Sequence, residues 1–193
     1  WPSEVMDPLK MPELEGGAQD ITLPFPQFCR VLCAMRAALE EAHAPFELAE
    51  RTLEPKGYAE SYGGRVTAHP KIDPRTGEMV WFAYGVGEPL GAGISYGVTN
   101  SAGEVVRRDD FQAPYSSMIH DFLVTDRHVL FPVLPLTGSL ERAMKSLPAY
   151  AWEPEKRSYV GVMARDADVS TIRWFETDAC YVFHPMNAWD EDG

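Results

Sequence analysis

The sequence predicts an all-β protein, on three observations. Beyond Pro45 the apolar residues come in short runs of about 4–8 residues, which is the length of single strands. Glycine, asparagine, aspartate and proline separate these runs, as they do at turns. Only Leu140–Leu147 reads as helical in this part of the chain, and only for one or two turns. Many short strands with turns between them favour a sandwich, a barrel or a propeller.

The first forty residues differ from the rest. Residues 1–27 contain five prolines and a Gly-Gly pair, and proline lacks the amide hydrogen that helices and sheets use. They predict an irregular arm. From Phe28 to Ala42 the apolar residues recur at spacings of four, three and four, which is the pattern of one helical face. A short amphipathic helix is therefore expected over residues 28–42.

Seven apolar runs predict individual strands. They are Met79–Tyr84, Gly93–Thr99, Glu104–Arg108, Phe122–Thr125, His128–Pro132, Tyr159–Ala164 and Ala179–His184. Residues 100–103 lie between the second and third of these runs and include Gly103, so they predict the loop of a hairpin.

Composition and charge exclude several classes of protein. The 193 residues correspond to about one to one and a half domains. The 29 acidic against 17 basic side chains give a net charge of −12, which repels phosphate backbones and argues against nucleic-acid binding. No stretch has the roughly 20 apolar residues of a spanning helix. The N-terminus has no pattern of a signal peptide, so a cytoplasmic location is expected.

The sequence offers little support for cysteine-based, nucleotide or serine-hydrolase chemistry. Cys29, Cys33 and Cys180 are an odd set, and the first two lack the second half of a zinc site. They are expected to be reduced and mostly buried thiols. The strands carry no GxGxxG, P-loop or GxSxG pattern.

Three of the five histidines have similar local settings. His69 and His184 are each followed by proline and are expected at the ends of strands, while His120 lies in an Ile-His-Asp-Phe segment. A single histidine of this kind is more often a structural residue than a ligand. Three of them brought to one axis could hold a metal, and imidazole suits iron, zinc and copper alike.

Three blocks that contain these histidines resemble a known family. TAHPKIDPRTGEM, SMIHDFLVTDRHVLFP and CYVFHPMNAWDE resemble, in order and content, motifs of the carotenoid cleavage oxygenases, and the similarity runs over residues 39–193. The resemblance implies a seven-bladed β-propeller, of which this chain covers roughly the first half. It divides the chain into a poorly matching helical or irregular arm, residues 1–37, and a partial propeller, residues 38–193. At roughly 40–45 residues a blade, about four blades are expected.

The resemblance also implies a metal site. His69, His120 and His184 would be ligands of Fe(II), and Glu41 would lie behind His120 or another ligand, orienting its ring and raising its basicity. A plain alternative is that Glu40 and Glu41 form a solvated face at the end of the helix. No catalytic acid or base is expected beyond the metal site. The family's fourth histidine is expected downstream of this sequence, since neither His43 nor His128 lies in a matching motif.

The function that the resemblance implies is cleavage of an internal C=C bond of an apocarotenoid or related conjugated alkene by O2, giving two carbonyl products. Peripheral membrane contact through an exposed apolar patch is a further expectation, and the oligomeric state is open. Stilbene cleavage is an alternative, although Glu40 stands where a phenol-binding lysine is expected. A non-catalytic propeller fragment and a three-histidine zinc hydrolase, with Asp121 or Asp190 as general base, are the rivals from other classes.

Overall fold

The computed structural model describes residues 37–39, 41–49, 52 and 54–191. Several predictions lie outside the described residues. They concern the arm over residues 1–27, the helix over residues 28–36, the pair Cys29 and Cys33, and Glu40. Of the expected helix, residues 37–39, 41 and 42 are described, and they form a short strand and a turn instead. Pairing with the strand that follows overrides the local helical pattern.

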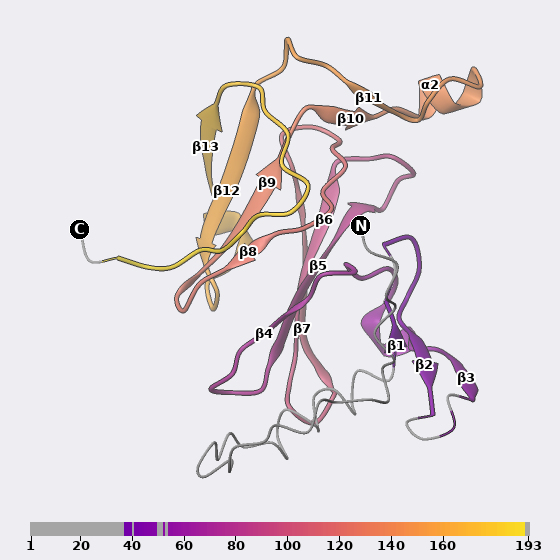
Figure 1. The fold of residues 1–193 in the computed structure, drawn as a ribbon, viewed down its shortest axis with the longest axis vertical. Helices are drawn as coiled ribbons and strands as arrows, with labels where there is room; N and C mark the ends of the chain where they lie inside the picture. Colours follow the sequence, from indigo (N-terminus) through magenta and orange to yellow (C-terminus); the bar gives the residue numbers. More distant parts are fainter. Residues whose placement is uncertain (1–36, 40, 50–51, 53, 192–193) are drawn as a thin grey trace, which may run out of the picture.

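Two four-stranded antiparallel sheets dominate the fold (Figure 1). The first follows chain order and consists of β4 (Lys71–Ile72), β5 (Met79–Val86), β6 (Gly93–Thr99) and β7 (Val105–Gln112). The second consists of β8 (Leu123–Val124), β9 (His128–Val133), β12 (Ser158–Ala164) and β13 (Arg173–Thr177). Sheets of four strands laid down by neighbouring stretches of chain are the units of a propeller. The all-β prediction is confirmed.

Smaller elements flank these sheets. β1 (Ala37–Ala38), β2 (Phe46–Leu48) and β3 (Pro55–Tyr58) form a three-stranded sheet. β10 (Leu136–Gly138) and β11 (Tyr150–Trp152) pair between β9 and β12, and the connection between them carries α2 (Leu140–Met144). The 3₁₀ turns η1 (Glu60–Tyr62) and η2 (Val169–Thr171) complete the described elements.

Six of the seven predicted strands are present, as are the hairpin loop over residues 100–103 and the short helix. The prediction for Ala179–His184 is wrong, because this apolar run is irregular. A strand needs a partner, and no described strand lies beside this run. The expectation of about four blades is also wrong for the described residues. Twenty-four residues, 134–157, form the two-stranded sheet β10–β11 and α2 rather than a further four-stranded sheet.

The core follows from the alternation of side chains along β5. Val80 and Phe82 point to the second sheet and join the larger hydrophobic cluster, whereas Met79 and Trp81 point to the opposite face and pack near the η1 turn. Gly97 lies opposite Trp81 in the β5–β6 ladder, where a Cβ would collide with the indole ring. The two sheets are therefore held face to face by large, fully buried side chains.

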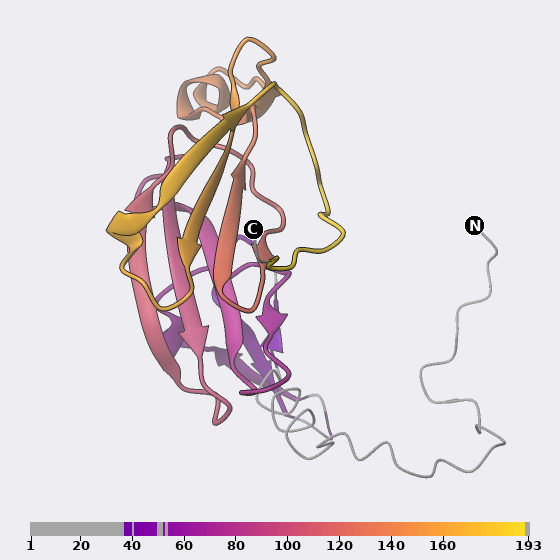
Figure 2. The ribbon, with the colours of Figure 1, turned by 90° about the vertical axis from the view of Figure 1, so that its left-hand side faces the viewer.

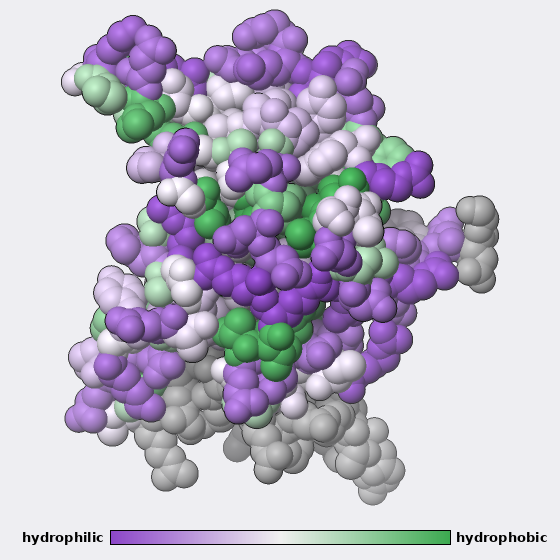
Figure 3. All heavy atoms as spheres, turned by 180° about the vertical axis from the view of Figure 1, so that it is seen from behind, coloured by the Kyte–Doolittle hydropathy of each residue, from purple (hydrophilic) through white to green (hydrophobic). Residues whose placement is uncertain are grey.

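An exposed apolar group lies at α2. Leu140, Met144 and Leu147 are 48%, 78% and 55% exposed, and apolar side chains appear at this end of the molecule at the upper left of Figure 3. Among the described residues, no helix is both long enough and apolar enough to cross a membrane. The predicted peripheral membrane contact stays a prediction, and the α2 surface is where it can be tested.

Buried charges join the two sheets at one end. Asp73, just after β4, accepts hydrogen bonds from Arg165 Nη1 at 2.7 Å and from the Arg75 amide at 2.9 Å, and its side chain is 6% exposed. Burial alone would raise the pKa of Asp73, but the hydrogen bonds from Arg165 and the Arg75 amide outweigh burial and hold the pKa below its ordinary value.

This pairing predicts an acid-sensitive contribution to stability. Because the folded state binds the Asp73 proton more weakly than the unfolded state, the contribution is complete above about pH 4 and is lost as the pH falls further. Asp73→Asn is expected to lower the free energy of unfolding by about 1–3 kcal/mol at pH 7. Denaturant titrations at pH 7 and pH 3 check this, since the gap between the two proteins should shrink at pH 3. An equal gap at both values would contradict the assignment.

Candidate metal centre

Two of the three histidines predicted to be metal ligands lie just before the first strand of a sheet. His69 precedes β4 by two residues and His120 precedes β8 by three. The expectation that His69 ends a strand is therefore wrong. Its backbone amide donates to Thr67 Oγ1 at 3.0 Å, which fixes the chain immediately before the sheet begins. Equivalent positions in two sheets that pack face to face bring the two side chains together.

His184 reaches the same place from a different kind of segment. After β13 the chain leaves the second sheet, and His184 lies on the irregular stretch that follows (yellow in Figure 2). Its ring makes edge contacts with both other histidines, with centroid distances of 4.9 Å to His69 and 4.7 Å to His120.

The three rings bring their nitrogens close together. His69 Nε2 and His120 Nε2 are 2.8 Å apart, and one nitrogen from each of the three residues lies within 4.8 Å of the others. Ring nitrogens bind first-row metals at about 2.0–2.1 Å, so two ligands at right angles lie roughly 3 Å apart. The donor set therefore fits one divalent first-row metal ion held by neutral imidazoles.

Glu41 lies behind His120. Its Oε1 pairs with His120 Nδ1, and its Oε2 accepts a hydrogen bond from the Tyr84 hydroxyl at 2.8 Å. A carboxylate on Nδ1 holds the proton on that nitrogen and leaves the Nε2 lone pair directed at the cluster. The Glu41 side chain is only 18% exposed, so the alternative of a solvated face is wrong for this residue.

The electrostatic surroundings of His69 favour its neutral form. Burial lowers the pKa of His69, and the neighbouring imidazoles of His120 and His184 lower it further, against an opposing effect of Asp121. A neutral imidazole is the form that binds metals. Burial, followed by the hydrogen bond to Glu41 and the charge of that carboxylate, raises the pKa of Tyr84 far above its ordinary value, so its hydroxyl remains a donor to Glu41.

Sequence reasoning missed the role of two neighbours of the histidines. Asp121, considered only as a hydrolytic base, accepts hydrogen bonds from Lys71 Nζ at 2.7 Å and from its neighbour's amide, and its Oδ2 lies 3.8 Å from His184 Nδ1. Phe183 stacks on the His120 ring at 3.9 Å. The signal for both was adjacency to a motif histidine.

The remaining histidines and the exposed cysteine lie apart from this cluster. The His43 ring contacts Tyr58, and His128 pairs with Asp190 at 2.7 Å. Asp190, the second carboxylate considered for a zinc hydrolase, is thus engaged by a histidine outside the cluster. Cys180 is exposed, contrary to the expectation of a buried thiol.

A cavity of about 540 Å³ opens beside the cluster. Aromatic side chains and one cation contribute to its wall, together with two members of the site. These residues are Tyr84, Tyr150, Phe183, Arg65, His120 and Glu41. Its size is within the range of pockets that hold small organic ligands.

Comparison with known proteins gives consistent matches. The family described as retinal pigment epithelial membrane protein (RPE65) matches residues 34–193. Isoeugenol monooxygenase of Pseudomonas putida is 42% identical over 159 residues, which are 80% of this chain and 33% of that protein. Carotenoid cleavage oxygenase 1 of Neurospora crassa is 35% identical over 164 residues, 80% of this chain and 30% of that protein.

The solved structures agree. The lignostilbene dioxygenase of Pseudomonas brassicacearum superposes with a TM-score of 0.69 and 34% identity, over 72% of this chain and 30% of that one. The chain thus spans about one third of the length of the relatives that it matches, rather than the half expected from the sequence.

Proposed function

This chain belongs to the RPE65/carotenoid cleavage oxygenase family, and on that premise we propose that it supplies the iron-binding part of an oxygenase. The proposed reaction cleaves a conjugated alkene with O2 to give two carbonyl compounds. The observation that carries the proposal is the convergence of His69, His120 and His184, with Glu41 paired to the far side of one ring.

The proposed reaction balances without an added reductant. Both oxygen atoms of O2 end as carbonyl oxygens, and the two alkene carbons supply the four electrons that O2 takes up as the C=C bond breaks. Fe(II), when bound, supplies the one-electron chemistry that lets O2 react with the alkene. The role of this chain's residues is to hold the ion and to place the substrate beside it.

Glu41 and Tyr84 act on the site through His120. The carboxylate fixes the proton on Nδ1 and the plane of the ring, and the Tyr84 hydroxyl holds the carboxylate from its other oxygen. Phe183 covers the face of the same ring, which keeps water from that side. No acid or base is required of these groups.

The comparisons favour an alkene conjugated to an aromatic ring as the first substrate class. Identity to isoeugenol monooxygenase is 42%, against 35% to the carotenoid cleavage oxygenase of Neurospora crassa. The cavity supports the same choice, because Tyr150 and Phe183 offer aromatic surface and Arg65 offers a donor for a phenolic oxygen. Apocarotenoids are the second class.

The experiment is an isotope-labelled cleavage assay. The purified protein is loaded with Fe(II) without oxygen, then given isoeugenol, a hydroxystilbene or an apocarotenal under ¹⁸O2. We expect iron-dependent aldehyde products that carry ¹⁸O in both fragments, with faster turnover of the two aromatic alkenes. Stoichiometric iron without any turnover would favour the non-catalytic alternative. Failure to bind iron would contradict the proposal.

Glu41→Gln is expected to weaken Fe(II) binding by about 10–100-fold, because a neutral amide holds the His120 Nδ1 proton more weakly than a carboxylate and raises the basicity of the ring less. Anaerobic competition titration measures the affinity. Glu47→Gln is the matched control, since Glu47 is an exposed residue on β2, and it should leave the affinity unchanged. Equal affinities for the two variants would show that Glu41 does not support the ligand.

A further inference from the structure

The segment that carries His184 is held differently from the other two predicted ligands. We call residues 178–190 the strap. His69 and His120 are each followed within three residues by a paired strand, whereas none of the strap's residues lies in a strand. Apart from the contacts that Phe183 and His184 make at the cluster itself, His184 depends on whatever fixes the strap at its ends.

The first anchor is Ser158, a fully buried residue at the start of β12. Its hydroxyl accepts a hydrogen bond from the Cys180 amide at 3.0 Å and lies 3.4 Å from the Cys180 carbonyl oxygen. This contact ties the beginning of the strap to one end of the second sheet.

The second anchor is Asp190. Its Oδ1 is 2.7 Å from His128 Nδ1, and its Oδ2 accepts from the Arg127 amide at 2.9 Å and lies 3.7 Å from Arg127 Nε. The Asp190 side chain is 13% exposed. The hydrogen bond from His128 is the main cause that lowers the pKa of Asp190, to about 2, so the carboxylate is charged at neutral pH.

The two anchors lie at opposite ends of the sheet. His128 begins β9 and pairs with Ala164, six residues along β12 from Ser158, so the anchors are roughly 20 Å apart. The ten-residue step from Cys180 to Asp190 could reach roughly 33–36 Å if extended. The extended length of the strap therefore exceeds the distance between its anchors, so the position of its middle depends on both anchors.

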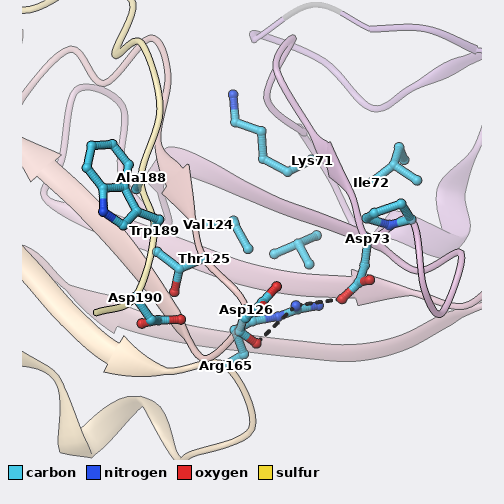
Figure 4. A pocket seen from close by; sticks show the side chains of 12 residues that line it. Lys71, Ile72, Asp73, Val124, Thr125, Asp126, Arg165, Ala188, Trp189 and Asp190 are labelled. Carbon is cyan, nitrogen blue, oxygen red and sulfur yellow. Dashed lines mark hydrogen bonds and ion pairs between the residues drawn. The ribbon is translucent and has the colours of Figure 1, made fainter. Parts of the chain in front are cut away.

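His184 lies in the middle of this span. Near the second anchor, Trp189 and Asp190 lie over the turn that carries Thr125 and Asp126 (Figure 4). We propose that the pairing of Asp190 with His128 and the Arg127 amide positions His184 against His69 and His120. Asp190 is then a positioning residue for the metal site, and this role rests on the proposed function.

Hydrogen exchange of the metal-free protein tests the anchor. Asp190→Asn removes the charge and leaves one acceptor oxygen for the two donors, His128 and the Arg127 amide. The amides of residues 181–189 are then expected to exchange about tenfold faster. Asp166→Asn is the matched control, because Asp166 is exposed on the turn after β12, and it should exchange as the original protein does. His128→Asn should reproduce the effect, and the double variant should add nothing further. Unchanged exchange in Asp190→Asn would overturn the proposal.

Iron titration tests the consequence for the site. We expect Asp190→Asn to weaken Fe(II) binding by about tenfold or more, while Asp166→Asn binds iron as the original protein does. Loss of the pairing also lowers the denaturation midpoint of Asp190→Asn, so the titration is made where denaturation curves show both variants fully folded. Faster exchange with unchanged iron affinity would overturn the positioning role. If the original protein binds no iron, the proposed function fails, but the exchange experiment still decides whether Asp190 holds the strap.

Discussion

His120→Ala is expected to reduce Fe(II) affinity by at least about 100-fold and to abolish alkene cleavage. His120 is the histidine with the most contacts in the site. Its Nε2 faces His69, its Nδ1 pairs with Glu41 and its ring stacks on Phe183. Loss of a partner behind a ligand already costs about 10–100-fold, so loss of the ligand itself should cost more. Elemental analysis after anaerobic Fe(II) loading, together with the cleavage assay, measures both effects.

His43→Ala is the control for this substitution. His43 is an exposed histidine whose ring contacts Tyr58, away from the cluster, and its replacement should leave the iron content unchanged. If His120→Ala retained near-stoichiometric iron at the original affinity, the three-histidine site would be wrong.

Phe131→Ala is expected to lower the free energy of unfolding by about 3–5 kcal/mol. Phe131 is fully buried on β9 at the centre of the contact between the two sheets, and four aromatic rings surround it. The centroid distances are 5.2 Å to Phe111, 6.1 Å to Tyr96, 6.2 Å to Phe122 and 6.3 Å to Phe82. Removal of this ring leaves a cavity that rigid neighbours cannot fill.

Equilibrium denaturation in urea measures this loss. Phe175→Ala removes the same ring from the edge strand β13, where it is 49% exposed, and should cost less than about 1 kcal/mol. Similar costs at the two positions would mean that the sheets do not pack through Phe131.

Local sequence signals predicted the elements that depend on neighbouring residues. Runs such as Met79–Tyr84 and Gly93–Thr99 became β5 and β6, and the loop before Glu104 became a hairpin, because strands that follow one another can pair directly. Ala179–His184 has the same apolar content and no such partner. The sequence cannot reveal that difference, since strand formation depends on the partner as much as on the strand.

For the candidate site, motif resemblance pointed to the three histidines and Glu41, and the structure brings all four together. Tyr84, Asp121 and Phe183 were beyond that reasoning. Asp121 and Phe183 adjoin a motif histidine in the chain, but adjacency does not show which site residue they contact. Tyr84 contacts Glu41 across 43 residues of chain, which leaves no periodic trace in the sequence.

By itself, the sequence determined the all-β class, most strand positions and the identities of the histidines. These properties depend on side-chain type, turn residues and short-range order. Only the tertiary structure decided that His69 and His120 precede the first strands of two facing sheets and that Glu41 lies behind one ring. It also decided that His184 lies on an irregular strap whose ends contact Ser158 and, through Asp190, His128. Those features depend on contacts between residues tens of positions apart, and folding of the chain alone brings such residues together.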